Sequence, residues 1–310
     1  MLTAALSIPS RQSKRPPFNG AEAPPCFDDP PGGLAGILQI GYDAERSKEE
    51  DGAMADFSYY DILQQGLPAD LRVARLVHGI SWTAAVLSDG KVGVAMHTAG
   101  ETVPRMFDSL TGLSLREAGE ALLSWNMEEA SEALAAVNAF YNSVGCPWTA
   151  PESKTLDGID MRGRTVGMIG KMIGHSNMTV ESFAAVKKLY IMDREEKPGA
   201  MPDSAAEFYL PLCDLVIITG SAAINKTLPR LLELSRNAQV IMTGPSVSCC
   251  PALLRLGIDR LHGQIITQKD AMLEAIVRKR TSVNAYSVLF LLEAAHDGHA
   301  AETRGKKTVS

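Results

Sequence analysis

Polar side chains that could hold a small anionic ligand gather in two segments, each of which directly follows a short apolar run of the chain. The members are Thr219, Gly220, Ser221, Asn225 and Thr227 in one segment and Gly244, Pro245 and Ser246 in the other. Hydroxyls and free backbone amides at the start of a helix attract carboxylate or phosphate groups. Helix capping by Ser221 or Thr227 is the structural alternative, and the two roles are compatible. We expect these segments to form the main part of a ligand site.

Two earlier segments of the same kind carry charged side chains. Gly170 and Lys171 follow one apolar run, and Asp193 and Glu195 follow the next. Lys171 is suited to an anion, and an acid about 20 residues past the first loop is where dinucleotide-binding domains hold a ribose hydroxyl. The glycines do not fit G-x-G-x-x-G, so an ordinary dinucleotide fingerprint is absent. A tight turn beside a solvated lysine, and an acid facing water, are the structural alternatives.

Residue types that bind metals form only weak patterns. The five cysteines include no C-x-x-C pair, so they predict neither a disulfide framework nor a zinc knuckle. His175, Cys249 and Cys250 are the candidate metal ligands, with one thiolate at a helix start; burial of the cysteines as small residues is the alternative. Three further histidines, isolated in apolar surroundings and expected to be structural, are His78, His97 and His262. No H-E-x-x-H motif is present.

Composition and charge exclude several classes of protein. The chain has 310 residues, of which 45% are hydrophobic, so it resembles a globular protein rather than a disordered one. With 30 basic and 36 acidic residues the net charge is −6, which offers no basic field for nucleic acid. No apolar run reaches membrane-spanning length, and no signal-peptide pattern is found. We therefore expect a cytoplasmic protein that binds neither nucleic acid nor a membrane.

The elements that must position these residues alternate regularly in the second half of the chain. The expected strands are 165–170, 188–192, 215–220 and 239–244, with a weaker fifth at 258–261, and the expected closing helices are 269–280 and 283–295. Short apolar runs, each followed by a loop and a plausible helix, predict a parallel sheet with crossover helices. Neighbouring parallel strands bring their following loops to the same edge of the sheet. The fold class is therefore α/β.

The first half predicts a smaller α+β domain. Its expected elements are a helix at 59–65, a hairpin of 81–87 and 91–97 turning at Asp89-Gly90, a helix opening with the capping box Ser114 and Glu117, and a helix at 127–142. A segment rich in proline and glycine precedes it and is expected to be flexible. We divide the chain into a tail at 1–52, a small α+β domain at 53–150 and an α/β domain at 151–310.

Four motifs occur in order in the second half of the chain: Lys197–Asp203, Leu215–Ser221, Ile224–Thr227, and Gly244–Ser246 through Gly257–Asp259. They resemble those of the putative heavy-metal chelation family, an uncharacterised prokaryotic group. Residues 79–83, 124–126 and 136–139 are similar, more loosely, to the N-terminal domain of that family. The resemblance implies an enolase-N-terminal-like domain followed by a Rossmann-like domain. It also implies a site for a metal or metal chelate at their junction, and the pair Cys249-Cys250 departs from the family pattern.

These observations lead to one main expectation and two alternatives. We expect a protein that binds a small anionic ligand or heavy-metal chelate between its domains and serves metal handling. The first alternative is an enzyme that uses a nucleotide-type cofactor, NAD or S-adenosylmethionine, with Asp193 or Glu195 on the ribose. The second is a regulatory partner without a ligand. The sequence leaves open the metal, any reaction and whether the chain forms a homo-oligomer.

Overall fold

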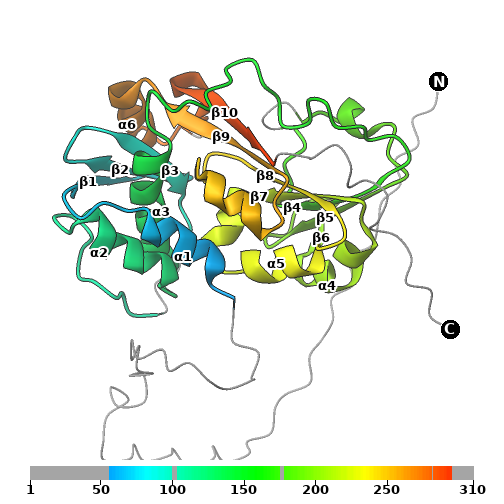
Figure 1. The fold of residues 1–310 in the computed structure, drawn as a ribbon, viewed down its shortest axis with the longest axis horizontal. Helices are drawn as coiled ribbons and strands as arrows, with labels where there is room; N and C mark the ends of the chain where they lie inside the picture. The colour runs from blue at the N-terminus through cyan, green and yellow to red at the C-terminus, as the bar shows by residue number, and fades with distance from the viewer. Residues whose placement is uncertain (1–55, 100–102, 175–177, 281, 295–310) are drawn as a thin grey trace, which may run out of the picture. The chain divides into compact units, whose positions relative to one another are not determined.

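A computed structural model describes residues 56–99, 103–174, 178–280 and 282–294. They form a mixed α/β structure with one large, mostly parallel sheet and one small antiparallel sheet (Figure 1). The expected tail at 1–52 lies outside the described residues. None of the helices in the described part of the chain has the length and apolar character that a membrane crossing needs.

The large sheet has seven strands in the order β10-β9-β8-β7-β4-β5-β6. Its strands are β4 (Thr165–Ile169), β5 (Lys188–Asp193), β6 (Met201–Pro202), β7 (Leu215–Thr219), β8 (Gln239–Thr243), β9 (Arg260–Ile266) and β10 (Ser287–Glu293). All neighbours pair in parallel except β10, which runs antiparallel to β9. After β4, the chain adds β5 and β6 on one side of β4. It then crosses back, and β7 pairs with the other side of β4. The strand order therefore reverses between β4 and β7, which is where open α/β sheets bind ligands.

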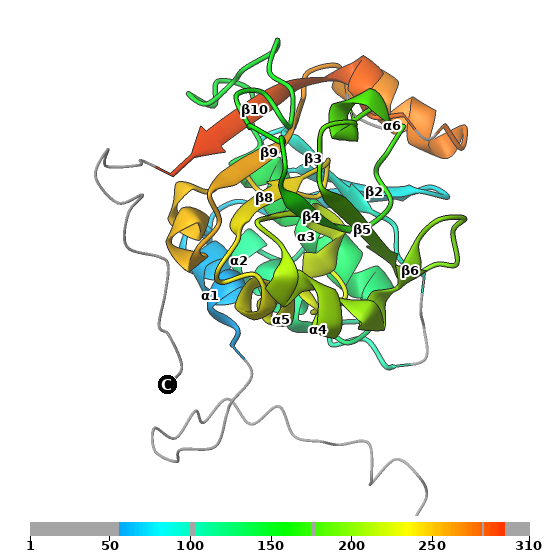
Figure 2. The ribbon, with the colours of Figure 1, turned by 90° about the vertical axis from the view of Figure 1, so that its right-hand side faces the viewer.

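Alternate residues of the central strands enter two separate cores, which explains why these strands are apolar throughout. Val216 and Ile218 of β7 pack with α4 (Ala206–Tyr209) and α5 (Leu228–Leu234), which lie on one side of the sheet (Figure 2). Leu215 and Ile217 belong to a second cluster with Phe183. A strand whose side chains are buried on both faces cannot show a period of two in its sequence.

The connections between the parallel strands are shorter and less helical than expected. The 3-10 helices η3 (Glu181–Phe183), η4 (Asp203–Ala205), η5 (Leu210–Leu212), η6 (Gly220–Ala223) and η7 (Pro251–Leu256) supply much of them. The α6 helix (Lys269–Val277) lies inside the expected 269–280 segment. The helix expected at 283–295 is wrong, because this segment forms η8 (Asn284–Tyr286) and the strand β10. Its apolar run pairs along its whole length with β9, and a run this short does not distinguish a strand from a buried helix by periodicity.

The small sheet has the order β1-β2-β3, with β1 at Val73–His78, β2 at Trp82–Leu87 and β3 at Val92–Met96. The hairpin of β2 and β3 was expected from Asp89-Gly90, whereas β1 was not. The helices are α1 (Ser58–Gln65), α2 (Leu115–Glu120) and α3 (Met127–Tyr141), with η2 (Ala121–Leu123) between the last two. The capping box of Ser114 and Glu117 is present at the start of α2. The sequence thus predicted each of these α-helices.

Contacts between the small sheet and the large sheet involve the segments that follow β7 and β8. Tyr60 Oη donates a hydrogen bond to the carbonyl of Ala223 at 2.8 Å, and the Met96 N–H donates to Ser246 Oγ at 2.9 Å. Tyr60 belongs to α1 and Met96 to β3, while Ala223 and Ser246 follow β7 and β8. The carboxyl edge of these two strands is therefore directed toward the small sheet and its helices.

Candidate metal centre

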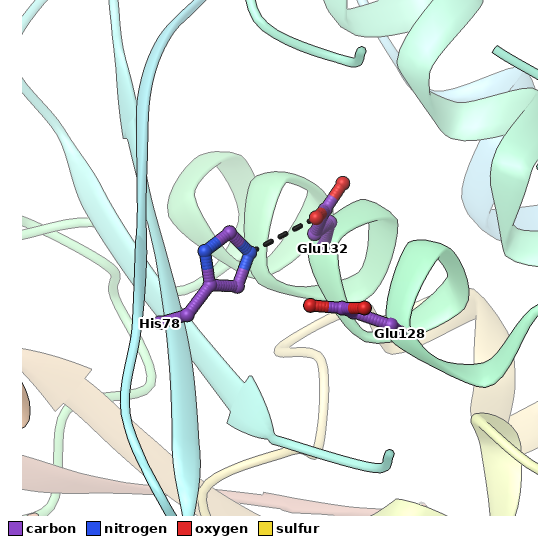
Figure 3. Close-up of side chains that lie close together, drawn as sticks. All are labelled: His78, Glu128 and Glu132. Atoms are coloured by element: carbon purple, nitrogen blue, oxygen red, sulfur yellow. Dashed lines mark hydrogen bonds and ion pairs between the residues drawn. The ribbon is translucent and has the colours of Figure 1, made fainter. Parts of the chain in front are cut away.

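Three side chains with metal-binding atoms converge beside the start of α3. A ring nitrogen of His78 and carboxylate oxygens of Glu128 and Glu132 all lie within 4.8 Å of one another (Figure 3). It is the only such group of at least three histidine, cysteine, aspartate or glutamate side chains among the residues that the structure describes. His78 ends β1, and both glutamates belong to α3.

Local helix geometry places the two glutamates on the same face. Residues four apart in a helix are neighbours on its surface, so Glu128 and Glu132 point in a similar direction. Asn126 fixes the start of α3, because its side-chain oxygen accepts a hydrogen bond from the Glu129 N–H at 3.0 Å. Glu128 lies in the first turn, where the positive end of the helix dipole also favours an acidic residue. The sequence therefore builds a carboxylate pair at a defined position.

His78 and Glu132 are already joined by a hydrogen bond. The distance from His78 Nε2 to Glu132 Oε1 is 2.9 Å, and Glu132 is buried whereas the His78 side chain is 38% exposed. This bond raises the pKa of His78 above its usual value, although partial burial opposes the rise. Burial alone would raise the pKa of Glu132, but the hydrogen bonds from His78 and Arg105 outweigh it and lower that pKa. Glu132 is therefore held as a carboxylate.

Arg105 is the second partner of Glu132. Its Nη1 donates to Oε1 at 3.3 Å, and its Nη2 donates to Oε2. The same guanidinium also lies 4.0 Å from Oε1 of Glu129. This fork-to-fork contact fixes the plane of the Glu132 carboxylate. Any cation that binds Glu132 must share it with Arg105.

Glu129 lies beside this group but has a structural role. Its carboxylate accepts hydrogen bonds from the backbone N–H groups of Met106 at 2.8 Å and Phe107 at 2.9 Å, and from the Ser124 hydroxyl. The residue is fully buried. Because three donors already occupy its oxygens, Glu129 holds the segment around Arg105 against α3.

Lys226 brings the segment after β7 to the same end of α3. Its Nζ donates to the carbonyls of Ser124 and, at 2.9 Å, of Ile224, and it lies 6.0 Å from the ring centroid of Trp125. Burial lowers the pKa of Lys226 to about 8, although the nearby charge of Glu129 opposes this. The segment 219–227 thus reaches the neighbourhood of the carboxylate group through Lys226.

The geometry of the three donors fits a divalent transition-metal ion. Bonds of about 2.0–2.2 Å from a metal to nitrogen and oxygen place adjacent ligand atoms roughly 3.0–3.4 Å apart. The 2.9 Å between His78 Nε2 and Glu132 Oε1 is close to one such edge. The widest separation in the group is at most 4.8 Å, so the three donor atoms are close enough to face a single ion. One imidazole and two carboxylates leave further coordination positions open.

The residues predicted from sequence lie in the loops of the large sheet, where several bond to one another. Thr219 Oγ1 is 3.1 Å from Ser221 Oγ, and a Cβ on Gly170 would lie 2.9 Å from Thr219 Cγ2. The loops after β4 and β7 therefore meet at the point where the strand order reverses. Asn225 Oδ1 accepts hydrogen bonds from the N–H of Thr227 at 3.1 Å and from its hydroxyl at 2.6 Å, directly before α5. Gly220 is buried, whereas Gly244 and Pro245 are half-buried beside the buried Ser246 described above.

Asp193 is engaged within its own loop. Its carboxylate accepts hydrogen bonds from the N–H of Lys171 at 2.7 Å and of Glu195 at 3.0 Å, and from Nζ of Lys197 at 2.9 Å. Burial works against ionisation, but these bonds outweigh it and lower the pKa of Asp193. The Glu195 side chain is exposed and lies 3.3 Å from Lys197 Nζ. Asp193 thus has the contacts of a residue that orders a turn.

The cysteines predicted as metal ligands do not join a histidine in the described part of the chain. Cys249 and Cys250 are both buried, and Cys249 Sγ lies 3.1 Å from Cys146 Sγ. His175 lies outside the described residues. Neither cysteine belongs to a group of three candidate ligands among the residues that the structure describes.

The three histidines that were expected to be structural have different surroundings. His262 is buried, its Nδ1 lies 3.1 Å from Thr155 Oγ1, and burial lowers its pKa to about 4. His97 contacts Thr83 Oγ1 at 3.1 Å. His78, in contrast, is not in apolar surroundings but faces Glu128 and Glu132. Sequence reasoning missed it because β1, which carries it, was not expected.

Comparisons with known proteins agree with the motifs of the second half. Two models of a family described as "Putative heavy-metal chelation" match residues 60–141 and 157–281. A crystal structure of a protein with unknown function from Desulfitobacterium hafniense DCB-2 is 29% identical, with a TM-score of 0.67, and the match covers 76% of this chain and 97% of that one. A second, from Pyrococcus horikoshii, is 22% identical, with a TM-score of 0.64, and covers 76% and 99%. No curated protein matches the chain.

Proposed function

Because the chain belongs to the putative heavy-metal chelation family, we propose that it binds a divalent transition-metal ion through His78, Glu128 and Glu132. The observation that carries the proposal is the convergence of these three donor atoms within 4.8 Å. The ion arrives either free or held by a small anionic chelator. The protein thereby serves metal handling.

The chemistry of the donors selects the class of metal. Imidazole nitrogen suits zinc, nickel, copper and iron, whereas carboxylate oxygen also suits manganese. Soft ions such as mercury and cadmium prefer thiolate sulfur, which this group does not contain. We therefore assign the site to a borderline ion such as Zn²⁺, Ni²⁺ or Co²⁺.

The open coordination positions and Arg105 favour an ion that keeps some of its own ligands. Three protein donors leave at least one position free in a tetrahedral site. Arg105 carries a positive charge at the same carboxylate and would attract a negatively charged ligand of the metal. A small carboxylate chelator thus suits the site better than a neutral one.

Calorimetric titration of the metal-free protein with Zn²⁺, Ni²⁺ and Co²⁺ tests the proposal. His78→Gln and Glu132→Gln each remove one donor, and we expect each to weaken binding by at least about 100-fold, since even indirect partners of a metal ligand are worth about 10–100-fold. His97→Gln is the matched control, because its ring lies 6.1 Å from that of His78 and is not part of the group. Equal affinity of His78→Gln and the unmodified protein would refute the site.

A further inference from the structure

Two thiols from distant parts of the chain lie in direct contact. Cys146 Sγ and Cys249 Sγ are 3.1 Å apart, although 103 positions separate the residues. Cys146 follows α3, and Cys249 lies in the segment after β8. Cys146 is half-buried whereas Cys249 is 4% exposed. Neither takes part in the proposed metal site.

One asparagine ties the segment of Cys249 to the end of α3, a few residues before Cys146. Asn142, which directly follows α3, accepts a hydrogen bond from the Cys249 N–H at 2.7 Å through its side-chain oxygen. Its Nδ2 donates to the carbonyls of Val247 at 2.8 Å and Gln264 at 3.2 Å. Since Asn142 is buried and all these bonds are made to backbone, the segment of Cys249 is tied to the end of α3.

Cys146 is held by a turn that starts from the same place. Its N–H donates to the carbonyl of Ser143 at 3.1 Å, and its own carbonyl accepts a hydrogen bond from Thr149 Oγ1 at 2.7 Å. The backbone on both sides of the pair is therefore ordered. Little conformational entropy remains to be lost when the two sulfurs join.

We propose that Cys146 and Cys249 form an intramolecular disulfide when the protein meets a low-molecular-weight disulfide such as oxidised glutathione. A disulfide requires about 2.05 Å between the sulfurs, so the pair has to close by roughly 1 Å. This shift is within the reach of side-chain rotation in two residues whose backbones are already positioned.

The exchange follows from the different exposure of the two thiols. Cys146, the more accessible one, loses its proton to solvent and attacks the oxidant; one glutathione thiolate leaves, and a mixed disulfide forms on Cys146. Cys249 Sγ then attacks Cys146 Sγ; the Cys249–Cys146 bond forms as the bond to glutathione breaks, and the proton of Cys249 passes to solvent or to the leaving glutathione thiolate. Two protein thiols are oxidised and one disulfide is reduced to two thiols. Burial raises the pKa of Cys249, which is consistent with this order of events.

The neighbouring cysteines provide matched controls. Cys250 is buried next to Cys249 in the sequence and has Tyr141 as a side-chain partner. Cys213 is buried and donates to the carbonyl of Tyr209 at 3.2 Å. Among the residues that the structure describes, neither donates a hydrogen bond to another cysteine sulfur or accepts one from it. We expect neither to be oxidised with Cys146.

Mass spectrometry on the full chain tests the proposal. After incubation with oxidised glutathione and blocking of free thiols, trypsin should release residues 117–154 linked to residues 237–255, with the mass lowered by two hydrogen atoms. The tryptic peptide 237–255 holds both Cys249 and Cys250, so variants assign the partner. Cys250→Ser should keep the link, and Cys249→Ser should lose it and retain glutathione on Cys146.

Two results would overturn the proposal. One is an unmodified protein that keeps all its thiols after oxidant treatment sufficient to oxidise a small free dithiol. The other is a cross-link from Cys146 that persists in Cys249→Ser. Thiol titration tests the first result on the unmodified protein. No variant is needed, so a folding defect of a variant cannot affect this test. The disulfide should also raise the melting temperature by several degrees, because it closes a long loop.

Discussion

Replacement of Arg105 with glutamine separates two roles that this side chain could have at the metal site. Arg105 donates to both oxygens of Glu132, so it either competes with a metal ion or holds the carboxylate ready for one. Glutamine removes the charge but keeps a hydrogen-bond donor of moderate length. We predict that competition dominates and that Arg105→Gln binds free Zn²⁺ more tightly.

The charge of Arg105 sets the size of the effect. A divalent ion about 5 Å from a guanidinium is repelled by roughly 7 kcal/mol at an effective dielectric constant of about 20, and by roughly 2 kcal/mol in bulk water. Arg105 is partly exposed and its charge is partly offset by Glu132, so we take the smaller value as a lower bound. Loss of this repulsion corresponds to about 30-fold in the dissociation constant.

The same change should destabilise the metal-free protein. Removing one partner of a buried ion pair costs about 3–5 kcal/mol. His78 remains as a partner of Glu132, and Arg105 is partly solvated, so we expect about 2 kcal/mol for the free energy of unfolding. In a domain of this size that is a fall of roughly 5 °C in melting temperature. Metal at 100 times its dissociation constant restores about 2.7 kcal/mol and should reverse the fall.

Calorimetric titration and thermal melting on the same samples decide between the roles. Arg162→Gln is the control, since it removes the same charge from an exposed pair with Asp160. An affinity for Zn²⁺ that is unchanged or lower in Arg105→Gln would refute the argument. A lower affinity would mean that the guanidinium positions Glu132 rather than opposing the ion.

Three further predictions concern the large sheet and the packing of α3. Burial lowers the pKa of His262 to about 4, below its value of about 6.5 in the unfolded chain, so stability should fall as pH drops. In urea unfolding, His262 should make the protein about 2 kcal/mol less stable at pH 5 than at pH 7. This contribution to the pH dependence should be absent in His262→Gln. Asn225→Ala should cost about 1 kcal/mol in urea unfolding through loss of the bonds to Thr227, with Zn²⁺ affinity unchanged; weakened binding would return Asn225 to the ligand site. Gly93→Ala should cost about 3 kcal/mol of stability and so lower the melting temperature, because the new Cβ would overlap the backbone nitrogen of Ala139; an unchanged melting temperature would contradict this packing.

Short sequence motifs correctly predicted those helices and turns that are stabilised by interactions between nearby residues. The capping box of Ser114 and Glu117 was sufficient for the start of α2, and Asp89-Gly90 was sufficient for the hairpin. The strand β10 was missed because only its pairing with β9 makes it a strand. The strand β1 was missed for a related reason: most of its side chains are exposed or half-buried, so its sequence lacks a clear apolar face.

The candidate site shows the same limit. Glu128 and Glu132 stand four positions apart in a helix that the sequence predicted. The sequence was therefore enough to place these two carboxylates on the same helix face. His78 lies 54 positions from Glu132, and the two meet only because α3 packs on β2 and β3 of the sheet to which β1 belongs. Sequence reasoning instead favoured the loops after parallel strands, since the general rule for α/β sheets concerns those loops. That rule correctly indicates the loops after β4 and β7, where the strand order reverses. It says nothing about residues on a second sheet, such as His78 on β1.

The α3 helix separates two kinds of donor chemistry in this chain. Its first turns carry the carboxylates that face His78, whereas the segment beyond its end carries Cys146 against Cys249. Tyr141, the last residue of α3, stands nine positions after Glu132, which is about 14 Å along the helix axis at about 1.5 Å per residue. Because the groups share no side chain, we predict that Zn²⁺ affinity in calorimetric titration is the same before and after oxidation of the thiols.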